Sequence, residues 1–499
     1  MKYFIGVDLG TSAVKLLLVN ENGNVVHEVS KSYPLIQEKT GFSEQNPQDW
    51  VDQTIEGLSE MMKTFKGNPE DIEGMSFSGQ MHGLVLLDED NEVLRHAILW
   101  NDTRTTAQCE KIYETIGEDR LLKITKNPAL EGFTLPKLMW VKENEPDLFE
   151  KAKTFVLPKD YLRYKLTGNV HMEYSDAAGT LLLDVMNREW SEQMCDTFGI
   201  HSSLCPPLIE STTDVGSVTS EITEETGISK ETSVIAGGAD NACGAVGSGI
   251  LSEGKTFCSI GTSGVVLSYE KDGDKNFDGK VHYFNHGAPG AYYTMGVTLS
   301  AGNSLRWFKD VFAENEDFDT MLQEVDTVPA GSNGLLFTPY LDGERTPHAD
   351  AAVRASFIGM DSSHQRKDFV RAVLEGITFS LHESIEIFRE SGKTIDTIIS
   401  IGGGAKNEVW LQMQADIFNA NIVKLKSEQG PGMGAAMLAA YGSGAFTSLQ
   451  ECADIFIREE KVFKPDAERV EKYKELFRIY QDVYLNTNKI NQKLMRFRS

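Results

Sequence analysis

Alternating apolar and polar residues predict several β-strands near the N-terminus. The predicted strands lie at 3–7, 14–20, 25–30, 72–77 and 84–87. The turn sequence ENGN separates the second strand from the third, as expected of a β-meander.

A helix is predicted for residues 46–65, between the meander and the later strands. Asn46 is a typical helix cap, and Pro47 suits the first turn because its missing N–H has no partner there. Apolar residues then recur at three- and four-residue spacing: Val51, Ile55, Leu58, Met62 and Phe65. Strands, helix and further strands in this order predict a mixed α/β fold.

The second half of the chain shows helical periodicity in two places. A buried helix is predicted where apolar residues lie four apart: Phe369, Val373, Ile377, Leu381 and Ile385. After Pro465, an apolar stripe predicts a helix that packs back onto the body: Tyr473, Leu476, Ile479, Tyr480, Val483 and Tyr484. Residues 397–418 between them read as a strand, a glycine loop and a helix.

One short pattern occurs twice, half a chain apart. DLGTSAVKLLL begins at Asp8, and SIGTSGVVLSY begins at Ser259 in this chain of 499 residues. Both place a Gly-Thr-Ser turn between two apolar strands. A repeat this distant is typical of two copies of one domain rather than of a solenoid.

Length and charge narrow the classes of protein. A chain of 499 residues is too long for one ordinary core, so we expect two large domains. The net charge of −26 argues against nucleic acid and against an anionic membrane surface as partners, because both require a basic face. Anions can still bind at glycine-rich turns and helix N-termini.

The six cysteines and the N-terminus favour a cytoplasmic protein. Cys109, Cys195, Cys205, Cys243, Cys258 and Cys452 include no pair at zinc-finger or redox spacing. The chain reaches Asp8 before a signal-peptide core could form, and it has no run of about 18 apolar residues. We therefore expect neither secretion nor a membrane span.

Asp8 is a lone carboxylate in an apolar strand, and such a group needs a partner. Gly10, Thr11 and Ser12 bring a tight turn, hydroxyls and backbone amides beside it, which is a common way to hold a phosphate. Asp8 could then hold magnesium. The alternative is a β-hairpin in which Asp8 accepts from local amides.

Asp240 also has two interpretations. It follows an apolar strand and heads a helix of small residues in VIAGGADNACGAVG, so it is either a helix cap or a catalytic base. The helix N-terminus is expected to keep it ionised, and nearby glycines let a substrate approach.

Two further turns carry polar groups suited to a polyhydroxylated ligand. FSGQMHG places Gln80, Met81 and His82 between two strands, offering neutral donors and acceptors beside an apolar wall. ILWNDTRT adds a polar rim that includes Trp100, or else a capped turn with an Arg104 salt bridge. The glycine run GGGAKN matches neither the dinucleotide nor the Walker spacing.

Taken together, these residues resemble the FGGY family of carbohydrate kinases, a branch of the actin-like ATPase superfamily, over almost the whole chain. GFTLPKLMWVKEN at 132–144 and ASFIGMDSSHQRKDFVRAVLE at 355–375 are similar to the two family signatures. SGQMHG, LWNDTRT, LPKDYLRYKLTG, SDAAGTLLLDV and PYLDGERTPH resemble the members that act on D-xylulose.

The resemblance implies two ribonuclease-H-like α/β domains with a cleft between them. Residues 1–248 would carry the sugar site and the first phosphate hairpin. Residues 249–499 would carry the nucleotide site, the second hairpin and the C-terminal helix. It also implies ATP and Mg²⁺ as cofactors, D-xylulose as substrate, D-xylulose 5-phosphate as product, and a possible homodimer.

The same resemblance implies the site residues. Asp240 would be the base for the 5-hydroxyl, and Asp8 the catalytic carboxylate that positions magnesium. The sugar-binding set would be Gln80, Met81, His82, Trp100, Asp240 and Asn241. The nucleotide-binding set would be Gly10, Thr11, Ser12, Gly261, Thr262, Ser263, Gly403, Gly404 and Asn407. Lys15, Arg104 and Arg345 receive no role.

Three alternatives remain at this point. A sister kinase of the family would act on ribulose, gluconate or glycerol. An actin-like or chaperone-type ATPase would share the hairpins without a sugar substrate, but the two signatures argue against it. A non-catalytic sugar sensor would not require the intact aspartates.

Overall fold

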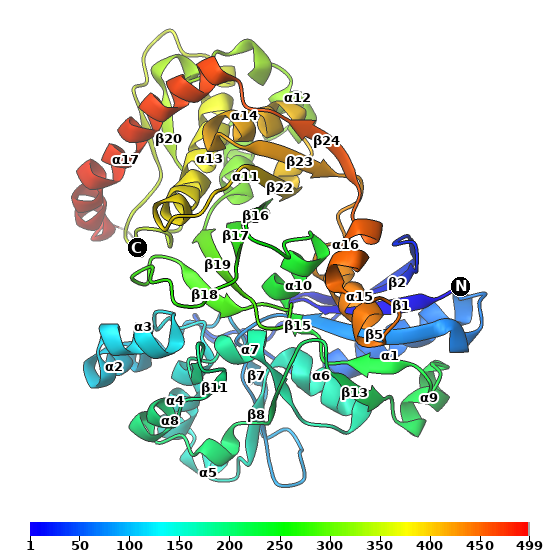
Figure 1. Cartoon of the computed structure of the whole chain (residues 1–499). Coiled ribbons are helices and arrows are strands. Elements are labelled where there is room, and N and C mark those ends of the chain that lie inside the picture. Colours follow the sequence, from blue (N-terminus) through cyan, green and yellow to red (C-terminus); the bar gives the residue numbers. More distant parts are fainter. Residues whose placement is uncertain (498–499) are drawn as a thin grey trace.

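The computed structural model describes residues 1–497 and shows two lobes, each built on a seven-stranded sheet (Figure 1). The N-terminal lobe holds the sheet of β1–β3, β5 and β13–β15, and the C-terminal lobe holds the sheet of β16–β19 and β22–β24. This confirms the predicted two-domain α/β fold.

The N-terminal sheet has the order β13-β14-β5-β1-β2-β3, with β15 also pairing with β5. β1, β2 and β3 form an antiparallel meander, and β5 runs parallel to β1. Its strands are β1 (Tyr3–Leu9), β2 (Ala13–Asn20), β3 (Val25–Ser32), β5 (Ile72–Gly79), β13 (Asp214–Ser217), β14 (Ser233–Ile235) and β15 (Gly238–Ala239).

The C-terminal sheet has the order β18-β19-β17-β16-β22-β23-β24. Its central part repeats the first sheet, because β16 and β17 are antiparallel while β22 runs parallel to β16. Its strands are β16 (Lys255–Ile260), β17 (Gly264–Glu270), β18 (His282–Asn285), β19 (Tyr292–Thr298), β22 (Thr397–Gly402), β23 (Asn421–Leu425) and β24 (Glu459–Phe463). The Gly-Thr-Ser repeat therefore marks two copies of one sheet topology.

Helices cover the sheets and bridge the lobes. In the first half they are α1 (Pro47–Thr64), α2 (Thr106–Ile116), α3 (Glu118–Thr125), α4 (Thr134–Asn144), α5 (Pro146–Phe149), α6 (Pro158–Thr167), α7 (Tyr174–Ala178), α8 (Glu192–Phe198), α9 (Ser220–Thr226) and α10 (Asp240–Gly247). In the second half they are α11 (Gly302–Phe312), α12 (Phe318–Leu322), α13 (Arg366–Glu390), α14 (Glu408–Phe418), α15 (Gly430–Gly442), α16 (Leu449–Phe456) and α17 (Ala467–Met495). Outside the two large sheets lie short strand pairs such as β6 (Val85–Leu87) with β8 (Thr154–Val156).

Local sequence signals explain where α1 begins and which face it buries. The Asn46 side chain accepts a hydrogen bond from the Gln48 backbone N–H, and Pro47 occupies the first turn. The buried face centres on Trp50, Leu58 and Met61, so it is rotated slightly from the predicted stripe through Met62.

The C-terminal helix packs on the body as predicted, with one difference. Tyr473, Tyr480 and Val483 are buried, whereas Ile479 is 48% exposed and lies off the contact face. The Tyr473 hydroxyl donates to a carboxylate oxygen of Glu375 on the buried helix α13 at 2.7 Å, which ties α17 to the centre of the C-terminal lobe.

One helix of the second half packs on the sheet of the first. α15 lies against β1 and β5 and crosses α10, and Figure 1 places these helices between the lobes. Glycines permit the close approach: a Cβ on Gly6 would lie 2.1 Å from the Gly432 carbonyl oxygen. The domain boundary between residues 248 and 249 stays a prediction. α15 lies after this boundary in the sequence, yet it packs against the sheet of the N-terminal lobe. Within residues 1–497, no helix combines the length and apolarity that crossing a bilayer requires.

Two glycines of α10 offer a matched test of this crossing. A Cβ on Gly247 would lie 2.6 Å from the Gly430 carbonyl oxygen, whereas a Cβ on Gly244 would meet nothing closer than 3.9 Å. We expect Gly247→Ala to destabilise the protein by about 1–3 kcal/mol because the helices must separate. Gly244→Ala should be neutral or slightly stabilising. Equal thermal unfolding midpoints for the two variants would contradict the close packing.

Candidate active site

Three neighbouring strands bring the predicted catalytic residues to one edge of the N-terminal sheet. β5 pairs in parallel with both β1 and β15, in registers that match Asp8 with Ser78 and Ala239 with Gly79. The Gln80 backbone N–H donates to the Leu9 carbonyl oxygen at 3.0 Å and extends this pairing. Asp8, the turn at Gln80 and Asp240 therefore lie side by side at the carboxyl ends of adjacent strands.

Asp8 is only partly exposed in β1, between the buried Val7 and Leu9. Burial raises the pKa of Asp8, while the Ser78 side chain and the Lys15 ammonium group oppose this rise. Lys15 itself pairs with Glu28 at 3.2 Å and donates to Gln429 at 2.7 Å. Among the residues that the structure describes, Asp8 has no ion-pair partner.

Asp240 begins α10, directly after β15. Its carboxylate accepts hydrogen bonds from the backbone N–H and the side-chain amide of Asn241, at 2.7 and 3.0 Å. Burial raises the pKa of Asp240 to about 7, and the neighbouring Asp8 carboxylate adds to this rise. The expectation that the helix N-terminus keeps Asp240 ionised is therefore wrong, because burial and the second carboxylate outweigh the helix.

The first phosphate hairpin is held firmly from several sides. The Gly10 backbone N–H donates to the Ala13 carbonyl oxygen at 3.0 Å, and Tyr33 donates its hydroxyl hydrogen to the Gly10 carbonyl oxygen. The Gln45 side chain donates to the Thr11 carbonyl oxygen at 2.7 Å. Ser12 is exposed at the tip of the turn. The hairpin is thus a rigid element with an open end.

Gln80 connects this hairpin to the predicted sugar loop. Its side-chain amide donates to Gln45, and its side-chain oxygen accepts from the Thr11 hydroxyl, both at 3.2 Å. The Trp100 indole N–H donates to the same Thr11 hydroxyl at 2.9 Å. Gln80 and Trp100 therefore lie beside the hairpin, as members of one hydrogen-bonded network.

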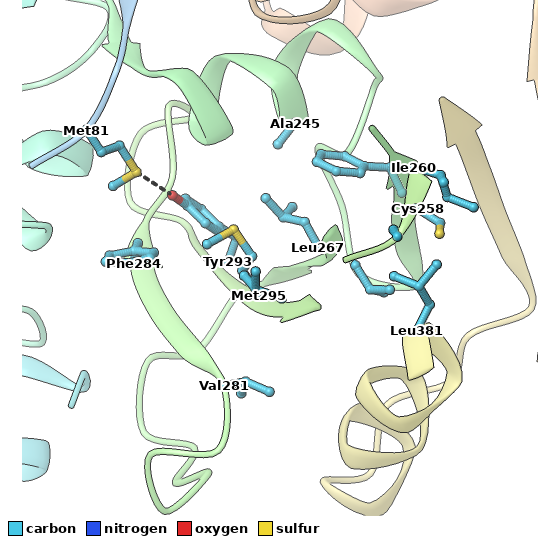
Figure 2. Packing of buried hydrophobic residues seen from close by; sticks show 14 of the residues in the cluster. Met81, Ala245, Cys258, Ile260, Leu267, Val281, Phe284, Tyr293, Met295 and Leu381 are labelled. Carbon is cyan, nitrogen blue, oxygen red and sulfur yellow. Dashed lines mark hydrogen bonds between the residues drawn. The ribbon is translucent and has the colours of Figure 1, made fainter. Parts of the chain in front are cut away.

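Met81 lies where the two lobes meet. Figure 2 shows the Tyr293 hydroxyl of β19 pointing toward the Met81 sulfur, at 4.0 Å. The Asn241 amide approaches the same sulfur at 3.7 Å. Because a thioether is a weak acceptor, both of these hydrogen bonds to Met81 are weak.

His82 is only partly exposed, and it is neutral near pH 7. Burial lowers its pKa to about 3, and its Nδ1 lies 2.8 Å from the Gly179 carbonyl oxygen. That contact makes Nδ1 the donor and leaves Nε2 as an acceptor. Its ring packs against Phe133 of the N-terminal lobe, with centroids 4.4 Å apart, and faces Phe284 of the C-terminal lobe at 6.1 Å.

The turn at 99–105 is mainly structural. Asp102 is buried and receives two side-chain hydrogen bonds from Arg104, at 2.9 and 2.7 Å. Arg104 also pairs with Glu44 at 2.6 Å and stacks over the Phe42 ring. The salt-bridge interpretation is therefore correct for Arg104, and Trp100 is the member of this turn that contacts the hairpin.

The predicted nucleotide residues of the C-terminal lobe also come together. Gly261, Thr262 and Ser263 form the exposed turn between β16 and β17. β16 pairs with β22 so that Ile260 is opposite Gly402, which places the run Gly403–Ala405 beside this turn. Asn407 caps α14, its side-chain oxygen accepting from the Trp410 backbone N–H at 3.0 Å.

A cleft of about 710 Å³ separates parts of the two lobes. Its walls come from both halves of the chain, with Gly247 and Ser248 on one side and Ser259, Gly402 and the segment 425–431 on the other. Gly402, the first residue of the glycine run, lines this cleft, whereas none of the predicted nucleotide-binding residues is in its lining. The nucleotide site therefore stays a prediction.

Sequence reasoning missed the residues that hold the site in place. Gln45 and Tyr33 support the first hairpin, and Ser175 accepts a hydrogen bond from the backbone N–H of Ala239, next to Asp240, at 2.9 Å. Tyr33 and Gln45 lie in no motif identified above, and Ser175 begins SDAAGTLLLDV without any sign of its contact with Ala239. These contacts depend on loops that only the folded chain brings together.

The chain belongs to the FGGY family of carbohydrate kinases. Residues 3–247 match the N-terminal domain of this family, and residues 256–443 match its C-terminal domain. The class is therefore a two-domain sugar kinase.

The relatives narrow this class further. The chain is 62% identical to the xylulose kinase of Bacillus subtilis over the full length of both proteins. It is 35% identical to the xylulose kinase of Escherichia coli, over 96% of this chain and 99% of that protein. Its structure matches a ligand-bound xylulose kinase from Lactobacillus acidophilus with a TM-score of 0.92 and 29% identity, covering 98% of each chain.

The raised pKa of Asp240 predicts a pH-dependent stability. A carboxyl group whose pKa is higher in the folded than in the unfolded protein stabilises the fold below about pH 4, and this contribution is lost as the pH rises through about 7. Without nucleotide and magnesium, Asp240→Asn should therefore gain free energy of unfolding relative to wild type between pH 4 and pH 8, by up to about 4 kcal/mol.

Urea unfolding at both pH values measures this difference. The control is Asp454→Asn, which changes an exposed carboxylate on α16 and should leave the difference unchanged. A constant difference between Asp240→Asn and wild type across this pH range would contradict a raised pKa.

Proposed function

We propose that this kinase transfers the γ-phosphoryl group of ATP to the 5-hydroxyl of D-xylulose, giving D-xylulose 5-phosphate and ADP. The observation that carries the proposal is the pair of carboxylates Asp8 and Asp240 at neighbouring strand ends beside a hydroxyl-bearing hairpin. Both side chains are only partly exposed, and desolvation raises both pKa values. The names of the full-length relatives supply the sugar.

Asp240 is the base in this proposal. It accepts the proton of the 5-hydroxyl as that oxygen attacks phosphorus, and the bond to the ADP oxygen breaks. In phosphoryl transfer, bond-making is late, so positioning and charge stabilisation contribute most and the proton moves late. Asn241 donates to the Asp240 carboxylate at 2.7 and 3.0 Å and fixes its orientation for this step.

Asp8 is the residue that would hold Mg²⁺. The fit is chemical: Mg²⁺ prefers carboxylate oxygens and usually keeps phosphate and water ligands besides one or two protein carboxylates. Asp8 is only partly exposed and has no ion-pair partner in residues 1–497, and a cation beside it would offset the cost of desolvating its charge. When bound, the ion would supply charge neutralisation for the phosphates of ATP.

The remaining predicted residues divide between two ligands. Gln80, Met81, His82, Trp100 and Asn241 line the sugar side, where neutral donors and acceptors suit hydroxyl groups. The nucleotide set follows the two hairpins and the glycine loop: Gly10, Thr11, Ser12, Gly261, Thr262, Ser263, Gly403, Gly404 and Asn407. A cytoplasmic location and a homodimer complete the proposal.

An ADP-release assay with magnesium and ATP tests the substrate. The panel is D-xylulose, D-ribulose, L-ribulose, gluconate, glycerol and no sugar. We expect kcat/KM for D-xylulose to exceed that for every other member by at least about tenfold, because a site built to hydrogen-bond one set of hydroxyls rejects the others. A preference for gluconate would contradict the proposed substrate. Gluconate is included because a gluconate kinase from Lactobacillus acidophilus matches this fold with a TM-score of 0.93 at 29% identity.

Removing the proposed base tests the mechanism separately. Asp240→Ala should lower kcat by about 10²- to 10⁴-fold, the usual contribution of a general base, while the protein stays folded and binds ATP. Calorimetric ATP binding and single-turnover phosphoryl transfer separate these properties. The exposed Asp454→Asn serves again as control with wild-type turnover. An Asp240→Ala variant with near-normal kcat would refute the assignment.

A further inference from the structure

Arg345 is a charged residue of the C-terminal lobe that the proposed mechanism does not use. Its side chain is only partly exposed, yet within residues 1–497 its guanidinium group makes no hydrogen bond and no ion pair. Burial lowers its pKa, which reflects the cost of withdrawing this charge from water. A guanidinium has five N–H donors, so a partly buried one without acceptors is suited to a ligand rich in oxygen atoms.

The backbone around Arg345 is fixed. The preceding residue, Glu344, is buried and accepts hydrogen bonds from the backbone N–H groups of Leu299 and Arg345, at 3.0 and 2.7 Å. The Ser380 hydroxyl on α13 donates to the same carboxylate at 3.0 Å, and the Thr298 hydroxyl also binds it. Arg345 therefore extends from an anchored segment rather than from a loose loop.

The segment that carries Arg345 runs along the same edge of β19 as β18, just beyond the residues that β18 covers. The Thr346 backbone N–H donates to the Val297 carbonyl oxygen at 2.9 Å, and the Val297 N–H donates to the Thr346 hydroxyl at 3.1 Å. Two residues earlier on this strand, Met295 pairs with His282 of β18. Arg345 and His282 are consequently neighbours along one edge.

That edge faces the sugar loop of the N-terminal lobe. His282 and Phe133 both stack on Phe284, and Phe133 packs at a tilt against His82. The Arg345 charge reaches both histidines. Burial and then this guanidinium lower the pKa of His282, and burial, Lys137 and then Arg345 lower the pKa of His82. Glu131, beside Phe133, is the carboxylate of the N-terminal lobe that attracts Arg345.

The order of these groups indicates which part of the sugar meets Arg345. Asp240 contacts Asn241, Asn241 contacts Met81, and His82 follows Met81. At one end of this row the Asp8 charge raises the pKa of Asp240, and at the other end the Arg345 charge contributes to the lowered pKa of His82. With the 5-hydroxyl at Asp240, the C1–C2 end of a five-carbon ketose lies toward Arg345.

We infer that Arg345 is a substrate-specificity residue contributed by the C-terminal lobe, donating hydrogen bonds to the C2 carbonyl oxygen and the C1 hydroxyl of the ketose. This inference rests on the proposed function. The two adjacent oxygens match the planar fork of a guanidinium. An alditol hydroxyl also accepts hydrogen bonds, but it stands on a tetrahedral carbon. Only the planar C2 carbonyl presents its oxygen in the plane of the fork, so the pair favours a ketose over the corresponding alditol.

The variant Arg345→Gln tests the inference when its binding of D-xylulose is compared with its binding of xylitol, since the two ligands differ at C2. We expect the variant to raise KM for D-xylulose by about ten- to a hundredfold with kcat lowered less than about threefold, because one substrate contact is lost. The dissociation constant of D-xylulose, measured by calorimetry without ATP, should rise in parallel. The dissociation constant of xylitol should change much less.

Two further variants make the test decisive. Arg345→Lys keeps the charge but not the fork and should fall between wild type and Arg345→Gln. Arg366→Gln removes an exposed arginine of the same lobe, which pairs with Glu316, and should behave as wild type. Circular dichroism and thermal unfolding show whether each variant folds, and Arg345→Lys carries the test if Arg345→Gln does not.

The inference is overturned if Arg345→Gln leaves the affinity for D-xylulose within twofold of wild type, or if both ligands lose affinity equally. A lower kcat with an unchanged KM would also overturn it. Failure of the proposed function is recognised independently, because wild type would then fail to turn over D-xylulose in the substrate panel.

Discussion

The structure depends on two carboxylates that share one buried edge of a sheet. Asp8 and Asp240 end neighbouring strands of the N-terminal lobe, and the charge of Asp8 contributes to the raised pKa of Asp240. Burying like charges side by side is unfavourable without a cation. The surrounding hydrogen bonds at Gly10, Gln80 and Asn241 hold the edge in this arrangement. The fold therefore keeps two carboxylates close together, and a magnesium ion bound with ATP would reduce their repulsion.

The same edge is the place where the lobes are joined. α15, from the second half of the chain, packs on β1 and crosses α10, the helix that Asp240 begins. The contacts at Gly6, Gly247 and Gly434 leave no room for a side chain. α15 therefore connects the second half of the chain tightly to the backbone beside both carboxylates.

A second junction lies on the sugar side. The buried side chain of Asn127 donates to the Tyr283 carbonyl oxygen at 2.7 Å and accepts from the Tyr283 backbone N–H at 3.2 Å, pairing with β18 much as a neighbouring strand would. On the neighbouring strand β19, the Tyr293 hydroxyl points toward the Met81 sulfur of the N-terminal lobe. Because both lobes line this region, a sugar bound there would contact residues far apart in the sequence, and Arg345 fits that pattern.

The sequence by itself determined the local elements and the repeat. Strand alternation, the Asn46–Pro47 helix start and the two Gly-Thr-Ser turns depend on neighbouring residues, so they can be read without the fold. The resemblance then pointed to Asp8 and Asp240. Only the tertiary structure decided the direction of the Asp240 pKa shift, the pairing of Arg104 with Asp102, and the supports at Gln45 and Ser175. It also decided that the Arg345 guanidinium group has no hydrogen-bond or ion-pair partner within residues 1–497. Burial and long-range contacts determine these properties, and both arise when distant segments pack together.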